Sequence, residues 1–105
     1  MIHTVYAVFA DAAEAERIAG TAVDEHLAAC ANILAPCLSI YRWQGRIERG
    51  QEVPALFKTA DPQALIARIA ELHSYDVPAA VAWPIEHSHP DYARWVEAES
   101  GPSGE

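Results

Sequence analysis

Hydrophobic positions at the start of the chain change from a strand-like run to a helical repeat. Residues 2–9 form a short apolar run with several β-branched and aromatic side chains, which is typical of a buried strand. Asp11 and Glu14 then have the spacing of a capping box, and apolar residues recur at helical spacing as far as Leu27. The pattern predicts a strand followed by a helix over residues 12–27.

A long apolar stretch, residues 28–43, has no helical repeat and indicates extended chain. Gln44-Gly45 before Arg46 supplies the positive-φ position that a tight hairpin turn needs. Pro36 cannot donate a ladder hydrogen bond, so it predicts a bulge or a change of pairing partner. About fifteen extended residues span roughly 50 Å, whereas a domain of this size has a radius of gyration of about 13 Å. The hairpin is therefore predicted to project.

Apolar side chains near the tip of the predicted hairpin would face water if the chain were alone. Exposed strand edges and apolar patches of this kind are normally covered by another chain. The residues are Ile40, Tyr41, Trp43 and Ile47. The pattern therefore predicts an oligomer.

The second half of the chain predicts another strand, helix and strand. Residues 49–52 resemble an irregular stretch, and residues 53–59 resume as strand. Asp61 is placed as an N-cap before Pro62 at the first helical position, and the helical stripe ends near Ser74. A helix between residue 61 and Ser74 follows.

The C-terminal part predicts an edge strand, a short helix and a frayed end. Residues 77–85 are apolar and contain prolines at both ends, which suits the edge of a sheet. Pro90 opens a short helix that carries Tyr92, Trp95 and Val96. The segment from Glu97 onward is small, polar and acidic, and it is predicted to fray.

The order of these elements predicts an α+β fold of the ferredoxin-like, split βαβ type. Such a fold has an antiparallel sheet with two helices on one face, here with a long hairpin between the second and third strands. A chain of 105 residues, 51% of them hydrophobic, holds one core. We expect a single domain over residues 1–98 and a disordered acidic tail over residues 99–105.

The net charge and the cysteine content limit which binding partners and which cellular compartment we expect. Fifteen acidic and seven basic residues give a net charge of −8, which disfavours nucleic acid and anionic membrane as partners. No stretch approaches the roughly 20 apolar residues of a membrane span. Cys30 and Cys37 would lie roughly 23 Å apart on one extended strand, so they are predicted to be reduced and unpaired. We expect a cytoplasmic protein.

Several segments together resemble the CutA family of divalent-cation tolerance proteins. They occur in the family's order, with matching separations, and they contain tryptophan, tyrosine and proline, which chance rarely matches. The segments are AACANI (28–33), SIYRWQGRIE (39–48), the strand from Glu52 to Thr59, LHSYDVP (72–78) and PDYARWV (90–96). The resemblance implies a homotrimer assembled through the long hairpin, similar in architecture to the PII signalling proteins.

The resemblance also implies a role in tolerance to divalent metal ions. Some bacterial members are credited with a copper site made by a cysteine that closes the first strand and a histidine pair before the tyrosine segment. Phe9 stands in place of that cysteine here, Leu72 stands at the first histidine, and His73 remains. Since tight copper sites combine several nitrogen or sulfur ligands, weak or indirect metal binding is expected, with His73 as the one ligand position carried over.

Two alternatives concern the histidines. His87 and His89 would point to the same side of an extended segment and could hold a divalent ion, copper or another. The other reading of this pair is an exposed turn before the helix that starts at Pro90. His73 has a second reading as well, because an imidazole at the end of a helix can bond the last carbonyls. Beyond such an ion, no cofactor is predicted.

A second candidate site follows from the family resemblance. CutA proteins have a cleft between subunits, and the matching residues here are Trp43, Glu52, Lys58 and Tyr75. A lysine, a phenol and an indole suit a small anion or an amphipathic ligand. Alternatively, Lys58 and Glu52 form an ion pair at the subunit interface while the aromatic residues fill the interface core.

No sequence signature of catalysis is present: the chain has no GxSxG, no glycine-rich phosphate loop and no HExxH. We therefore expect a protein that is not an enzyme. Three functions remain open: a trimer involved in metal tolerance, a PII-like trimer that binds a small ligand in its cleft, and a trimeric scaffold for another protein.

Overall fold

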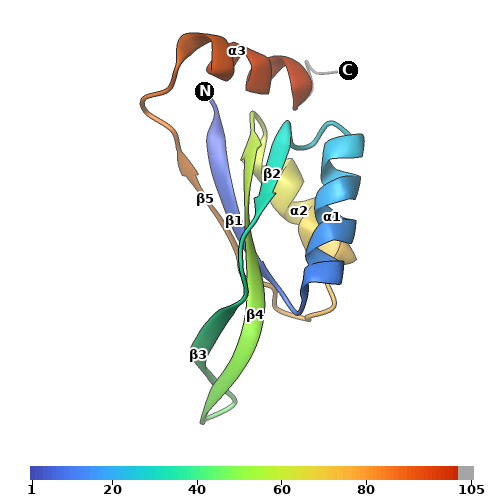
Figure 1. Ribbon diagram of the computed structural model, residues 1–105, viewed down its shortest axis with the longest axis vertical. Helices are drawn as coiled ribbons and strands as arrows, with labels where there is room; N and C mark the ends of the chain where they lie inside the picture. Colours follow the sequence, from blue (N-terminus) through green and yellow to red (C-terminus); the bar gives the residue numbers. More distant parts are fainter. Residues whose placement is uncertain (102–105) are drawn as a thin grey trace.

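The computed structural model describes residues 1–101, which form an antiparallel sheet and three helices (Figure 1). In chain order the elements are β1 (His3–Phe9), α1 (Ala12–Asp24), β2 (Cys30–Ile33), β3 (Cys37–Trp43), β4 (Arg46–Thr59), α2 (Pro62–Leu72), β5 (Ala80–Pro84) and α3 (Pro90–Glu99). The sheet order is β2-β4-β1-β5, all pairs are antiparallel, and β3 pairs with the other half of β4. The predicted α+β class with an antiparallel sheet is confirmed.

The core lies between the sheet and the two helices α1 and α2, which cover the same face (Figure 1). Odd-numbered residues of β1 point into it, and Phe9 meets Phe57 of β4 with ring centroids 6.4 Å apart. Ile18 of α1 and Leu65 and Ile69 of α2 are also fully buried. Burying each of these side chains contributes about 1.5–3 kcal/mol, so the body of the molecule has a conventional hydrophobic core.

α1 ends at Asp24, three residues before the predicted end at Leu27. The His26 N–H donates to Val23 at 3.1 Å, the Leu27 N–H donates to Ala22 at 2.9 Å, and His26 adopts a positive φ of 59°, which turns the chain out of the helix. His26 also makes a long-range hydrogen bond, because its carbonyl accepts the Gly101 N–H at 3.0 Å. The helix therefore ends in a local cap at His26, although apolar residues continue at helical spacing to Leu27.

The predicted extended stretch 28–43 is two strands separated by residues 34–36. Ile33 pairs with Ala55 and Cys37 pairs with Glu52, so three residues on one side face two on the other. The bulge predicted at Pro36 is therefore confirmed, whereas the change of partner is not, since both strands pair with β4. Cys30 faces Lys58 and Cys37 faces Glu52, positions six residues apart along β4, and both cysteines are free.

The hairpin of β3 and the first half of β4 projects from the body, as the sequence predicts (Figure 1). The molecule measures 44 × 25 × 22 Å, and Gln44 and Gly45 form the turn with φ angles of 51° and 79°. The prediction of an irregular stretch at residues 49–52 is wrong. These residues lie within the 14-residue β4, because β3 supplies a complete antiparallel ladder beside them.

Among residues 1–101, β5 pairs only with β1, which confirms the predicted edge strand, although it begins at Ala80 rather than at residue 77. The prediction of fraying is wrong for residues 97–101. α3 continues to Glu99, and Ser100 is buried, where its hydroxyl accepts the Ala60 N–H at 2.9 Å. The rest of the predicted tail, residues 102–105, lies outside the described residues. No helix within residues 1–101 is long and apolar enough to cross a membrane.

Candidate functional site

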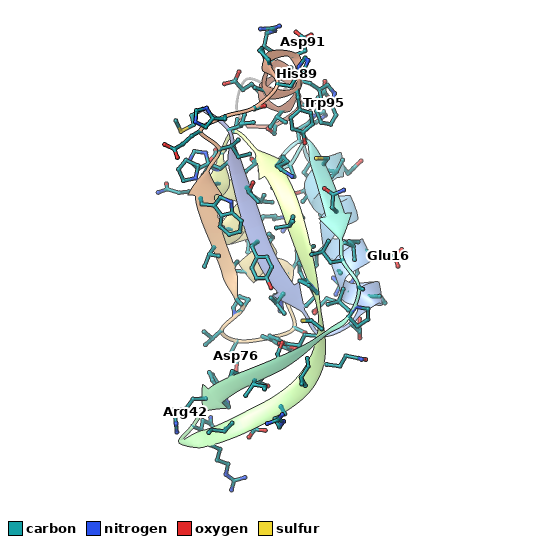
Figure 2. All side chains as sticks on the ribbon, turned by 60° about the vertical axis from the view of Figure 1, so that its left-hand side comes forward. Glu16, Arg42, Asp76, His89, Asp91 and Trp95 are labelled. Carbon is teal, nitrogen blue, oxygen red and sulfur yellow. The ribbon has the colours of Figure 1, made fainter. Side chains whose placement is uncertain are left out.

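A cleft of about 600 Å³ lies where the hairpin leaves the body. One wall comes from β3 and β4, the other from the segment that follows α2, and Val8 of β1 also contributes. Figure 2 shows Asp76, from the segment after α2, beside the base of the hairpin, and Arg42 near the far end of the hairpin. The lining residues are Val8, Ser39, Ile40, Tyr41, Trp43, Glu52, Tyr75, Asp76, Val77 and Ala79.

Three of the four residues predicted to bind a ligand line this cleft together: Trp43, Glu52 and Tyr75. Lys58, the fourth, does not line it in the single chain. It lies on the same strand as Glu52 but six residues farther along, opposite Thr4 and Cys30. At about 3.3 Å per residue this places the two backbones roughly 20 Å apart. Within one chain the cleft is therefore apolar and acidic.

Tyr75 and Glu52 are joined across the cleft by a hydrogen bond. The Tyr75 hydroxyl donates to Oε2 of Glu52 at 2.8 Å. Partial burial raises the pKa of Tyr75, and the hydrogen bond to the Glu52 carboxylate and its negative charge raise it further. The phenol therefore keeps its proton at neutral pH, and the bond ties the segment after α2 to β4.

His73 caps the C-terminus of α2, and both of its ring nitrogens are engaged. Nε2 lies 2.7 Å from the carbonyl oxygen of Val8, so it carries a proton and donates. Nδ1 accepts the backbone N–H of Tyr75 at 3.1 Å. This assignment from the bonding partners describes a neutral imidazole, and metal binding at either nitrogen would break one of these bonds. The metal role of His73 stays a prediction.

Phe9 fills the place where the family resemblance puts a cysteine. Its side chain is fully buried, and its ring stacks on the His73 imidazole with centroids 5.2 Å apart and planes at 15°. A phenyl ring offers no lone pair to a metal ion. The neighbourhood of His73 is therefore an aromatic stack rather than a set of ligands.

His87 and His89 lie at the other end of the molecule from the cleft. Figure 2 shows His89 and Asp91 at α3, far from Asp76 at the hairpin. The His89 side chain is the N-cap of α3, and its Nδ1 accepts the Asp91 N–H at 3.1 Å, while His87 is exposed. Within residues 1–101 there is no group of three or more His, Cys, Asp and Glu side chains placed to hold a metal ion.

Glu14 is a residue whose full role the sequence pattern missed. Its side chain is only 6% exposed, and its two oxygens accept the backbone N–H groups of Ala10 at 2.9 Å and Ser74 at 2.8 Å. Burial raises the pKa of Glu14, but these hydrogen bonds outweigh burial and hold the pKa below its ordinary 4.5. The capping-box spacing was the only signal, and it concerns the start of α1, not Ser74.

The family model and the known proteins that match this chain point to the same family. The model of the family described as CutA1 divalent ion tolerance protein matches residues 3–99. A divalent-cation tolerance protein CutA from Pyrococcus horikoshii is 40% identical over 98 residues, which cover 91% of this chain and 95% of that protein.

Solved structures with the same fold are similar over nearly the whole chain. A divalent cation tolerance protein (Cut A1) from Thermus thermophilus superposes with a TM-score of 0.92 at 38% identity, covering 96% of this chain and 100% of that one. A periplasmic divalent cation tolerance protein CutA from Archaeoglobus fulgidus gives 0.87 at 33% identity, covering 91% and 95%.

Proposed function

Because the chain belongs to the CutA1 family of divalent ion tolerance proteins, we propose that it acts as a homotrimer in tolerance to divalent metal ions, copper among them. We further propose that it binds these ions weakly or influences them indirectly. The observation that carries the weak-binding part is His73, whose two nitrogens are bonded to Val8 and Tyr75 while Phe9 covers its ring. A metal ion would have to displace a protein contact there, and selective copper binding needs several nitrogen or sulfur ligands.

The trimer is supported by the projecting hairpin. Leu38, Ile40 and Ile47 are 64%, 55% and 64% exposed in the single chain. Apolar side chains this exposed on a protruding pair of strands are typical of an interface with another subunit. The strand order β2-β4-β1-β5 with α1 and α2 on one face supports the description of the protomer as ferredoxin-like.

Native mass spectrometry during titration with copper and zinc tests assembly and metal binding together. We expect the mass of a trimer and no fixed number of ions at low micromolar metal. A fixed number of ions that His73→Gln removes would contradict weak binding, and His73→Gln keeps both a donor and an acceptor at this position. The His87→Ala, His89→Ala double variant is the matched control for the pair at α3, where loss of ions would move the site to that end.

A second candidate function, binding of a small ligand in the cleft, is supported by the convergence of Trp43, Glu52 and Tyr75 on one volume. In a trimer of PII type this cleft would be completed by a neighbouring subunit, which is where Lys58 could enter. The test is a metabolite screen by melting temperature. A ligand-dependent rise that Lys58→Ala abolishes, with the trimer intact, supports this function, and a screen without any shift contradicts it.

The proposed functions are not enzymatic, and we propose the cytoplasm as the location. Neither function requires a nucleophile or a base. Fractionation of cells that express the full-length protein tests the location. Recovery from the periplasm, the compartment that the name of the Archaeoglobus fulgidus relative gives, would overturn this part of the proposal.

A further inference from the structure

Glu14 connects the start of α1 to one wall of the cleft. It stands in the first turn of α1, and its Oε2 accepts the N–H of Ser74, a residue 60 positions away that follows α2. Its Oε1 accepts the N–H of Ala10 just before the helix. A buried carboxylate that accepts two backbone donors from different segments clamps those segments together.

The wall of the cleft begins at the residue after this clamp. Tyr75, Asp76, Val77 and Ala79 all line the cleft. Within the described chain no backbone hydrogen bond holds Asp76 or Val77, and the next one after Tyr75 is from the Val8 N–H to the Ala79 carbonyl at 3.1 Å. The position of the wall therefore depends on its anchors at either end.

Three consecutive residues form the first anchor. His73 donates to the Val8 carbonyl, Ser74 donates to Glu14, and Tyr75 donates its backbone N–H to His73 and its hydroxyl to Glu52. The Ser74 bond is the only one of these that ends on α1. Without it, residues 73–75 remain tied to β1, β4 and the end of α2, where the His73 N–H donates to the Ile69 carbonyl, but no longer to α1.

We propose that Glu14 is a positioning residue for the cleft: by holding the Ser74 N–H it fixes the segment 74–79 as the wall and keeps Tyr75 directed at Glu52. The inference concerns the cleft of the second candidate function, and it rests on that function only in so far as the cleft binds a ligand. The conformation of the segment 74–79 can be measured in the ligand-free protein.

The charge of Glu14 is part of this role, because a carboxylate accepts two N–H groups whereas a protonated carboxyl puts a hydrogen on one of its oxygens. The charged or titratable groups around it are Asp11 at the helix N-cap, Arg17 on the next turn of α1 at 3.9 Å, and the His73 ring on the segment after α2. Glu14→Gln keeps one acceptor oxygen but points an NH₂ group at one of the two N–H donors.

Amide hydrogen exchange of the ligand-free protein compares Glu14→Gln with Glu16→Gln. Glu16 is on the same helix and exposed, and Figure 2 shows it pointing outward from α1. We expect Ser74 and Tyr75 to exchange about tenfold faster in Glu14→Gln, which corresponds to a loss of about 1.4 kcal/mol, and at the wild-type rate in Glu16→Gln.

Two results would overturn the proposal. One is unchanged exchange at Ser74 in Glu14→Gln. The other is the same acceleration at Ser74 and at core amides such as Ala55, which would mean that Glu14 affects only global stability.

If Glu14→Gln does not fold, the wild type provides the measurement. The Ser74 amide proton resonance should titrate below pH 4.5 together with the Glu14 carboxyl. An amide that does not follow the carboxyl contradicts the clamp. Because no ligand is used, a cleft that binds nothing leaves this test unaffected.

Discussion

The body and the hairpin of this protein use their apolar residues in opposite ways. In the body, Phe9, Phe57 and Leu65 are completely buried by the chain's own helices. On the hairpin, Leu38 and Ile47 are equally apolar and remain mostly exposed, because β3 and the first half of β4 form a two-stranded ribbon that no helix of the described chain covers (Figure 1). The body can be stable by itself, whereas a two-stranded ribbon is marginal without a partner. The cleft lies at the junction of these two regions.

The largest expected effect comes from charging the hairpin. Ile40→Asp combined with Ile47→Asp places two carboxylates on exposed apolar positions, and burial of unpaired charge at an interface is strongly unfavourable. We expect the proposed trimer to dissociate into folded protomers, measured by analytical ultracentrifugation with circular dichroism. Val23→Asp, on an exposed apolar position of α1, is the control and should leave the assembly intact. A trimer that survives both charges would mean that the hairpin is not the interface.

The next effect is on the body. Phe57→Ala removes a fully buried ring that contacts Phe9, and such a deletion lowers the free energy of unfolding by about 3–5 kcal/mol. Thermal and denaturant unfolding measure this loss. Val23→Ala, from a side chain that is 39% exposed, should cost far less. Equal losses at the two positions would contradict the assignment of the core.

Glu14→Gln should lower the free energy of unfolding by about 2 kcal/mol at neutral pH, because two hydrogen bonds to a buried carboxylate are weakened. The folded-state pKa of Glu14 lies below its ordinary 4.5, so the stabilisation is complete above pH 4.5 and is lost as the pH falls through the folded-state pKa. The difference between wild type and Glu14→Gln should therefore shrink in acid. A difference that stays constant between pH 7 and pH 3 would show that the charge is not involved.

The smallest effect is expected at the junction. Tyr75→Phe removes the hydroxyl that donates to Glu52 and should cost at most about 1 kcal/mol, since the site is partly open to water. Denaturant unfolding measures the loss. The control is Tyr41→Phe in the same cleft, whose hydroxyl makes no hydrogen bond within residues 1–101. Identical values for the two variants would mean that the bond to Glu52 adds no stability.

Local patterns in the sequence were sufficient for most strands, helices and turns of both regions. The alternation of β1, the stripe of α2 after its Asp61 cap, the turn at Gly45 and the bulge at Pro36 each depend on residues within a few positions of one another. The cleft residues were implied by the family resemblance, and three of the four converge: Trp43 and Glu52 are on one hairpin, and packing brings Tyr75 to Glu52 from 23 residues away.

The features that only the tertiary structure decided all involve residues far apart in the chain. Residues 49–52 are strand because β3 lies beside them, Ser100 is buried because it bonds Ala60, and Glu14 is a clamp because it accepts the Ser74 N–H at 2.8 Å. Composition and spacing report what each segment can do, but hydrogen-bond partners separated by tens of residues are chosen when the segments pack, and this packing assigns Glu14 and His73 their contacts.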